Sequence, residues 1–164
     1  MMEKTNLDAI DLQLLSQLQV DASLTNQDLA ARVHVSPPTC LRRVKRLRDA
    51  GLIERVIAVL SVDQLAEVAG YGLCALAEIT LDHQDNQALE AFEQRVAREE
   101  AVQQCYRVSP GPDFCLVVQV AQMPDYLALA QRLFTADANV RNVKTFFSVK
   151  RSKFGARVAL PLPL

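Results

Sequence analysis

Three arginines between residues 36 and 50 have the residue type and spacing that most clearly point to chemistry: Arg42, Arg43 and Arg46. On a helical wheel Arg42 and Arg46 fall opposite an apolar side, and Arg43 lies on its flank. That apolar side consists of Cys40, Leu41, Val44 and Leu47. A guanidinium group has the planar set of donors that binds guanine edges and phosphates. The pattern predicts a helix that packs on one side and contacts a nucleic acid on the other.

The charge of the chain is concentrated around these arginines, although the 164-residue sequence has a net charge of only −1. Residues 1–31 contain one base and five acids, residues 32–55 seven bases and two acids, and residues 56–164 ten bases and twelve acids. The three segments therefore carry −4, +5 and −2. A local basic patch in a nearly neutral protein is typical of a small nucleic-acid-binding module. A solvated helix face without a partner is the alternative.

The elements that must position the arginines are three short helices, predicted over 8–19, 26–32 and 36–50. The expected N-caps are Asp8, Thr25 and Ser36, and Gly51 follows the third helix as its C-terminal stop. Three short helices with tight turns, the third one basic, predict a helix-turn-helix. The N-terminal half of a recognition helix usually reaches base edges. We therefore expect DNA contacts from Pro38, Thr39, Arg42, Arg43 and Arg46, with Thr39, Arg42 and Arg43 toward the bases and Arg46 toward a phosphate.

The second half of the sequence alternates strand and helix patterns. Strands are predicted over 71–81, 102–108, 114–121 and 143–150, and helices over 85–98 and 124–136. The order βαββαβ is the ferredoxin-like unit. The expected fold class is therefore α+β, with a winged-helix-like helix-turn-helix domain followed by a ferredoxin-like domain. Strands 71–81 and 114–121 are apolar on both faces while the helices cover only one, so the other face is expected to pack on a partner.

These elements divide the chain into a helix-turn-helix domain (1–60), a linker (61–70), a ferredoxin-like domain (71–150) and a tail (151–164). Residues 52–60 are rich in β-branched residues and predict an extended segment. Residues 62–70 are expected to form a short helical or irregular linker that ends at a glycine. The tail cannot continue a central strand past its prolines.

The cysteines and histidines do not form a pattern typical of a metal site. The four cysteines, at positions 40, 74, 105 and 115, form no CxxC pair, and His34 and His83 lie far from them in sequence, which disfavours structural zinc. Cys105 and Cys115 would lie nearly opposite each other in a hairpin, where a disulfide is conceivable, but reduced core thiols are expected. A cysteine nucleophile would have only His83 as a base, so we expect neither an enzyme nor a cofactor.

The ends and the hydropathy of the chain predict a cytoplasmic protein without a membrane partner. The N-terminal residues include acids where a signal peptide would need a basic and then an apolar run. No stretch approaches 18 uncharged apolar residues.

A more specific pattern is formed by spaced residues in the first third of the chain. It consists of Leu7-Asp8-Ala9-Ile10-Asp11, Thr25-Asn26, Leu29-Ala30-Ala31-Arg32-Val33, Val35-Ser36-Pro37, Cys40-Leu41-Arg42-Arg43-Val44, Leu47 and Gly51-Leu52-Ile53. With the predicted βαββαβ order, it resembles the Lrp/AsnC family of feast/famine transcription regulators over roughly residues 7–149. The resemblance implies binding of double-stranded operator DNA through a helix-turn-helix at residues 26–45. It also implies homo-oligomers, as dimers or octamers, that sense an amino acid or a related small metabolite at subunit interfaces.

The resemblance also implies an effector site around the turn Ser109-Pro110-Gly111-Pro112-Asp113-Phe114. Pro110 replaces the usual glycine of the family and removes a backbone N–H, so an effector contact there is lost or rearranged. Asp113 is expected either to pair with the ammonium group of an amino acid or to cap the turn through its own backbone. Thr145 corresponds to a family position that faces the ligand cleft, or is simply a strand residue. The expected effector-binding residues are Ser109, Gly111, Asp113 and Thr145.

A second departure from the family is Asn139, which replaces a glycine and is expected to be structurally silent because asparagine tolerates left-handed backbone. The complete prediction is a sequence-specific DNA-binding transcription regulator whose DNA binding is modulated by a small metabolite, an amino acid. The alternative is a metabolite-binding or catalytic ferredoxin-like module without a DNA function, against which the +5 segment argues.

Overall fold

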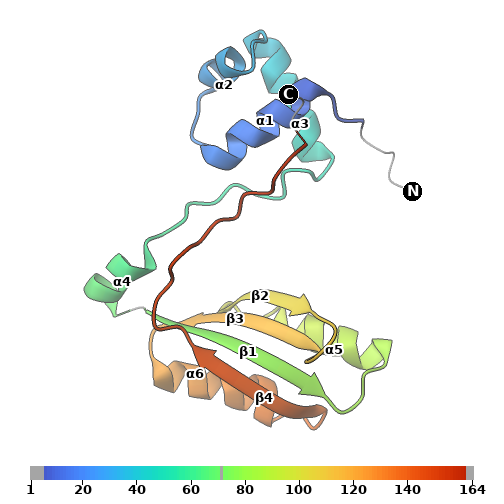
Figure 1. Cartoon of the computed structure of the whole chain (residues 1–164), viewed down its shortest axis with the longest axis vertical. Helices are drawn as coiled ribbons and strands as arrows, with labels where there is room; N and C mark the ends of the chain where they lie inside the picture. The colour runs from blue at the N-terminus through green and yellow to red at the C-terminus, as the bar shows by residue number, and fades with distance from the viewer. Residues whose placement is uncertain (1–5, 71, 162–164) are drawn as a thin grey trace. The chain divides into compact units, whose positions relative to one another are not determined.

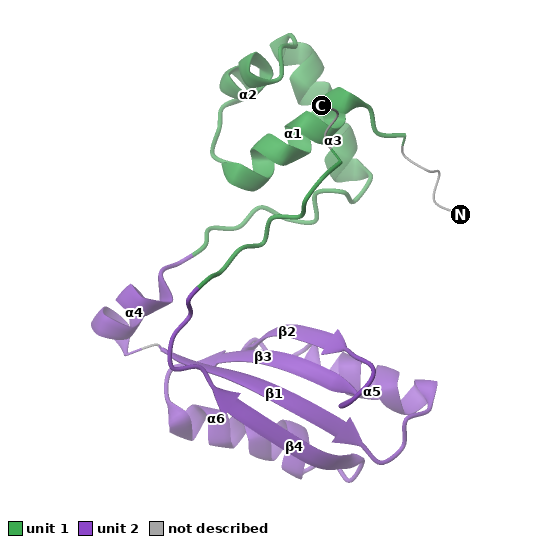
Figure 2. Cartoon of the chain, viewed as in Figure 1, with its two compact units in different colours: residues 1–59, 153–164 green, residues 60–152 purple. Residues whose placement is uncertain are grey.

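The chain folds into two compact units. The computed structural model describes residues 6–70 and 72–161. The first unit consists of residues 1–59 together with 153–164, and the second of residues 60–152 (Figure 2). Tyr71, the first residue of the strand predicted over 71–81, and residues 162–164 of the predicted tail lie outside the described residues.

The first unit contains three helices, α1 (Ala9–Val20), α2 (Asn26–Arg32) and α3 (Pro37–Asp49) (Figure 1). The predicted helix-turn-helix order is confirmed. Side-chain caps explain where α1 and α2 begin, whereas Ser36 stands at the N-cap position of α3 without a side-chain cap hydrogen bond. The Asp8 carboxylate accepts a hydrogen bond from the Asp11 amide at 2.9 Å, and the Asp11 carboxylate accepts one from the Asp8 amide at 3.2 Å. Thr25 caps α2 by accepting the Asp28 amide at 3.1 Å. Helix α3 ends at Asp49 with Ala50 as its C-cap, and Gly51 follows with a φ of 71°, in the left-handed region that glycine tolerates.

The core of the first unit lies between its three helices. Its buried residues are Leu14, Leu29, Ala30, Val33, Cys40, Val44 and Leu47. The sequence-based expectation for Leu41 is wrong, because 61% of this residue is exposed. The spacing of Cys40, Val44 and Leu47 places them in one row along α3, whereas Leu41 lies about 100° around the helix from Cys40.

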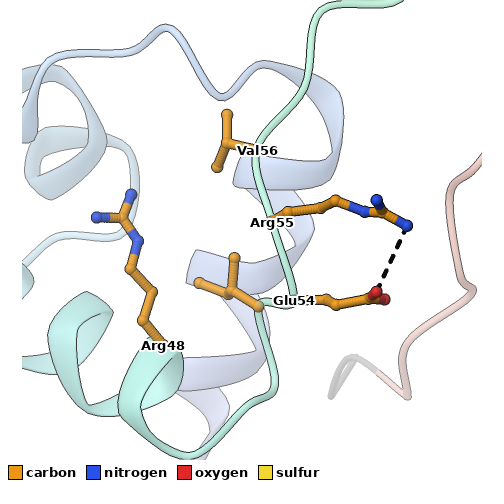
Figure 3. A pocket seen from close by; sticks show the side chains of 5 residues that line it. Arg48, Glu54, Arg55 and Val56 are labelled. Atoms are coloured by element: carbon orange, nitrogen blue, oxygen red, sulfur yellow. Dashed lines mark ion pairs between the residues drawn. The ribbon is translucent and has the colours of Figure 1, made fainter.

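The segment after α3 forms no strand within the described residues, although its composition is β-branched. It contributes Ile53, Glu54, Arg55 and Val56 to a shallow cavity of about 490 Å³ that also includes Arg48 of α3 (Figure 3). The predicted helical linker is helix α4 (Val62–Ala69), which Ser61 caps and which ends at Gly70.

Besides α4, the second unit contains the predicted ferredoxin-like sheet with the helices α5 and α6. Its strands are β1 (Leu73–Leu81), β2 (Val102–Arg107), β3 (Phe114–Val120) and β4 (Val140–Phe147), in the antiparallel order β2-β3-β1-β4. Helix α5 (Asn86–Val96) precedes β2, and α6 (Met123–Ala130) continues through a π-helical turn, Gln131–Thr135. Strand β4 begins three residues earlier than predicted.

Helices α5 and α6 cover the same face of the sheet (Figure 1). On that face, alternate residues of β1 and β3 are buried with Phe92 of α5 and Leu129 of α6. On the opposite face, Leu76 of β1 pairs with Phe146 of β4, and they are 46% and 44% exposed. Tyr106 of β2 lies on this face as well and is 53% exposed. The uncovered face of the sheet therefore carries large apolar side chains in neighbouring strands.

The strand register separates the two cysteines that the sequence placed opposite each other. Cys105 pairs with Leu116, and Tyr106 pairs with Cys115, so Cys105 and Cys115 lie on opposite faces of the sheet. Both are free thiols. Cys105 is exposed as a residue, so it is not a core thiol. Partial desolvation of its sulfur, followed by the charge of Glu93, raises the pKa of Cys105 above its ordinary value, which disfavours the reactive thiolate.

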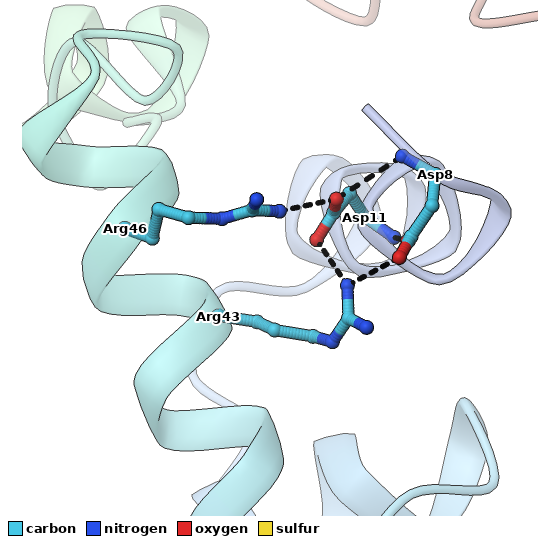
Figure 4. A network of polar contacts seen from close by, with 4 residues as sticks. All are labelled: Asp8, Asp11, Arg43 and Arg46. Atoms are coloured by element: carbon cyan, nitrogen blue, oxygen red, sulfur yellow. Dashed lines mark hydrogen bonds and ion pairs between the residues drawn. The ribbon is translucent and has the colours of Figure 1, made fainter. Parts of the chain in front are cut away.

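A buried carboxylate connects α1 to α3 (Figure 4). The side chain of Asp11 is fully buried and accepts hydrogen bonds from Arg43 Nη1 at 2.9 Å and from Arg46 Nη2. Arg43 Nη1 also donates to Asp8 at 2.7 Å. The hydrogen bond from the Asp11 amide and the one from Arg43 hold the pKa of Asp8 below its ordinary value. The hydrogen bonds to the carboxylates of Asp8 and Asp11 raise the pKa of Arg43, which favours its charged form.

We expect Asp11→Ala to destabilise the first unit by about 3–5 kcal/mol, because it leaves the partly buried Arg43 without its buried partner. Urea unfolding of the full chain, followed by circular dichroism, measures the loss. Asp8→Ala is the matched control, since it removes a half-exposed partner and a cap and is expected to cost about 1 kcal/mol. Equal stabilities of the two variants would contradict the central role of Asp11.

Candidate functional site

All five predicted DNA-binding residues lie on α3, but they differ in exposure. Pro38 and Arg42 are exposed, and the half-buried Thr39 shares a hydrogen bond of 2.9 Å with the Ser36 hydroxyl. The side chains of Arg43 and Arg46 are 23% and 47% exposed. The N-terminal turn of α3 is held by the Asn26 side chain of α2, which donates to the Pro37 carbonyl at 2.8 Å.

The three arginines of the basic face have different partners. Arg43 and Arg46 are bound to acids of α1, whereas Arg42 makes no ion pair among the residues that the structure describes. A guanidinium has five N–H donors, so Arg46 keeps donors for a further ligand while Asp11 orients it. Arg42 is the arginine of this set that is free to turn toward a base edge.

The sequence prediction missed Lys45, which is exposed and lies three residues after Arg42. Residues three apart on a helix are neighbours on its surface, so the Lys45 ammonium and the Arg42 guanidinium share one side of α3. The concentration of bases in residues 32–55 was the signal that could have identified it.

Among the predicted effector residues, Asp113 forms hydrogen bonds with the C-terminal end of β1. Its carboxylate accepts a hydrogen bond from the Leu81 amide at 2.7 Å and one from Gln84 Nε2 at 3.3 Å. Its own amide donates to the Ile79 carbonyl at 2.8 Å. Asp113 therefore connects the turn to the end of β1 through its carboxylate and its amide, and its carbonyl closes the turn by accepting the Val108 amide at 3.0 Å. Ser109 and Gly111 are exposed, and Gly111 has a φ of 119° that only glycine readily adopts.

Thr145 lies on the helix-covered face of β4, opposite the buried Ala77 of β1. Its hydroxyl is 2.5 Å from the hydroxyl of Tyr126, a buried residue of α6. Phe147 packs edge-on against the Tyr126 ring. Because Thr145 and Asp113 adjoin β1 from β4 and β3 respectively, the strand separates them within one protomer.

A shallow cavity of about 350 Å³ lies at the start of α5, and none of the four predicted effector residues lines it. Arg95 and Asp137 form an ion pair in its wall. Asn139 accepts a hydrogen bond from the His83 amide at 2.8 Å and donates one to the His83 carbonyl at 3.2 Å. Asn139 is therefore not structurally silent, because it fixes the loop that precedes α5.

The described residues contain no group of three or more histidine, cysteine, aspartate or glutamate residues that could hold a metal ion. They also contain no helix long and apolar enough to cross a membrane.

Comparison with known proteins agrees with this division into two functional parts. A family model described as winged helix-turn-helix DNA-binding matches residues 7–54, and one described as the Lrp/AsnC ligand binding domain matches residues 74–158. The leucine-responsive regulatory protein of Rhizobium meliloti is 35% identical over 98% of this chain and 100% of its own length. That of Escherichia coli K12 is 31% identical over 94% of this chain and 92% of its own.

Solved structures give the same result. A transcriptional regulator from Neisseria meningitidis in complex with L-Met has a TM-score of 0.82 and 28% identity, covering 95% of this chain and 98% of that one. An AsnC family transcriptional regulator from Agrobacterium tumefaciens has a TM-score of 0.83 and 26% identity, covering 96% and 100%. Agreement in sequence and in fold, over nearly the whole of both units, shows that this chain belongs to the Lrp/AsnC family of DNA-binding transcription regulators.

Proposed function

We propose that the chain controls transcription by binding an operator through α3 and that an amino acid bound to the second unit changes this affinity. The observation that carries the proposal is the exposed basic side of α3 on a unit distinct from the ligand-binding domain. The relatives named as leucine-responsive and the neighbour solved with L-Met support an amino acid as the effector class. The coupling is a linkage: an effector that prefers one assembly shifts DNA affinity by its differential binding free energy.

For the DNA contact, we assign base readout to Arg42 and Thr39, with Pro38 beside them at the N-terminal half of α3. Arg46 is assigned to a phosphate, because Asp11 orients its guanidinium while part of it stays exposed. Arg43 is assigned mainly to holding α3 against α1, because it donates to both Asp8 and Asp11. A recognition helix that is held against α1 in this way enters the major groove already oriented.

For the effector, we propose that Asp113 accepts the ammonium group of an amino acid, while Ser109, Gly111 and Thr145 supply hydrogen-bonding groups. Since β1 separates Asp113 from Thr145 within one protomer, a site using both types of residue needs groups from a second copy. Two copies are expected to meet through the uncovered sheet face, where Leu76 and Phe146 expose apolar surface. A dimer would also present two recognition helices to a two-fold related operator.

We expect Arg42→Ala to weaken binding to an operator selected from random duplexes by about 1–3 kcal/mol, the range for a bidentate base contact, without lowering the thermal midpoint. Arg46→Ala should lower the slope of log affinity against log salt by about one, the value for one phosphate contact. Arg43→Ala should lower the thermal midpoint as well as the affinity. Fluorescence anisotropy and thermal unfolding measure the two effects, with Arg98→Ala in the second unit as the control. Wild-type affinity in Arg42→Ala would remove Arg42 from the DNA contact.

We expect the full chain to form at least dimers at micromolar concentration, and Leu76→Glu to lower the molar mass toward the 18.2 kDa of one chain. Dimerisation of this variant would bury the glutamate charge in the apolar interface, which is unfavourable. Static light scattering after size exclusion measures the mass. Leu127→Glu, which alters an exposed leucine of α6, is the control. A monomeric wild type, or a Leu76→Glu protein of unchanged mass, would contradict the interface.

We expect at least one of the twenty amino acids to raise the thermal midpoint, because a ligand that binds only the folded state stabilises it. Asp113→Asn should lose about 1.5–3 kcal/mol of that binding energy, since the charge for the ammonium group is gone. The asparagine oxygen still accepts the Leu81 amide, so the fold is kept. Pro110→Gly should change effector affinity while leaving effector-free DNA binding intact. Unchanged binding to both variants in isothermal titration would place the effector elsewhere.

A further inference from the structure

The C-terminal segment is the second basic stretch of the chain. Residues 56–147 contain six bases and twelve acids, whereas residues 148–164 contain four bases and no acid. These bases are Lys150, Arg151, Lys153 and Arg157. The segment thus resembles the basic segment 32–55 in charge and differs from the sheet domain that immediately precedes it.

The end of this segment contacts α1 of the first unit. The Val158 amide donates to Gln19 Oε1 at 2.6 Å, and Gln19 Nε2 donates to the Val158 carbonyl at 3.1 Å. Arg157 Nη2 donates to the Ser16 hydroxyl at 3.2 Å, and Ser16 is almost completely buried. Residues 153–164 accordingly group with the helices of the first unit (Figure 2).

The chemistry of this contact is recognition of an extended backbone. A glutamine amide has one acceptor and a donor side by side, which match the N–H and C=O of a single residue. Only the backbone of Val158 is used, because 64% of this residue remains exposed. Pro161 follows, and proline fixes φ, so less conformational entropy is lost on docking.

We infer that the face of α1 formed by Ser16 and Gln19 is a docking surface for the C-terminal segment of this chain, and that docking adds phosphate-binding cations to the DNA-binding unit. Residues 1–59 contain eight bases and seven acids, a charge of +1, and Lys153 and Arg157 raise it to +3. A guanidinium has five N–H donors, so Arg157 keeps donors for a phosphate while one of them is used by Ser16. The inference rests on the proposed DNA binding, which supplies the polyanion.

The size of the expected effect follows from counterion release. Each phosphate neutralised by a protein cation contributes about 0.9 to the slope of log affinity against log salt on duplex DNA. Cations on an undocked, flexible segment contribute less, because holding them at the DNA costs conformational entropy. Docking therefore converts a loose basic tail into a fixed part of the binding surface.

The first measurement tests the docking by hydrogen exchange on the full chain. In the wild type the Val158 amide should exchange severalfold more slowly than in Gln19→Ala, which removes its acceptor. Val158→Ala is the matched control, since it keeps both backbone groups and should retain the slow exchange. Equal exchange of this amide in the wild type and Gln19→Ala would overturn the docking.

The second measurement tests the role in DNA binding on a random-sequence duplex between about 50 and 200 mM salt. Lys153→Gln should lower the salt slope by about one, and Val158→Pro, which removes the docked N–H, should lower it by about one to two. Val158→Ala and Arg98→Gln, which changes net charge in the second unit, should keep the wild-type slope.

Unchanged slopes in Lys153→Gln and Val158→Pro would overturn the electrostatic role of the tail, even if exchange shows that it docks. A wild type that binds no duplex at all would instead contradict the proposed DNA binding, and the exchange experiment would still decide the docking.

Discussion

The buried carboxylate of Asp11 is the interaction on which the DNA-binding unit depends. An ionised group removed from water is tolerated only when it is paired and hydrogen-bonded, and here two guanidinium groups and the Asp8 amide meet that need. Because both arginines come from α3, one buried charge fixes the rotation of that helix about its axis. The position of Arg42 on the outer side of α3 then follows from the helical repeat.

In the second unit, too, residues proposed to bind a ligand also stabilise the fold. Asp113 accepts the Leu81 amide and Gln84, and Thr145 shares a hydrogen bond with Tyr126. A ligand that engages these groups competes with hydrogen bonds that hold the end of β1 and the contact between β4 and α6. Binding energy can therefore be converted into a change of the sheet edge and of α6, which is what linkage between effector and DNA requires.

Charge is distributed along the chain in blocks that match these roles. The basic segment around α3 and the basic C-terminal segment flank an acidic sheet domain. Such a distribution attracts a polyanion to one unit while the net charge of the whole protein stays near zero. The contact between Gln19 and Val158 gives the C-terminal segment a defined place in that arrangement.

Local sequence patterns were sufficient to predict the helices of the first unit, the order of strands and helices in the second, and the basic side of α3. These features depend on caps, turn residues and periodicity within a few neighbouring residues, which is why local patterns predict them. Only the tertiary structure decided which arginines are free. Arg43 and Arg46 meet an acid more than thirty residues away, and nothing local distinguishes them from Arg42.

Long-range contacts also decided the position of the cysteines and of the C-terminal segment. A shift of one residue between β2 and β3 moves a side chain to the other face, so the register alone separates Cys105 from Cys115. The pairing of Gln19 with Val158 spans 139 residues and uses only backbone groups at the tail. Such a contact has no sequence pattern of its own, because every residue except proline offers the same N–H and C=O.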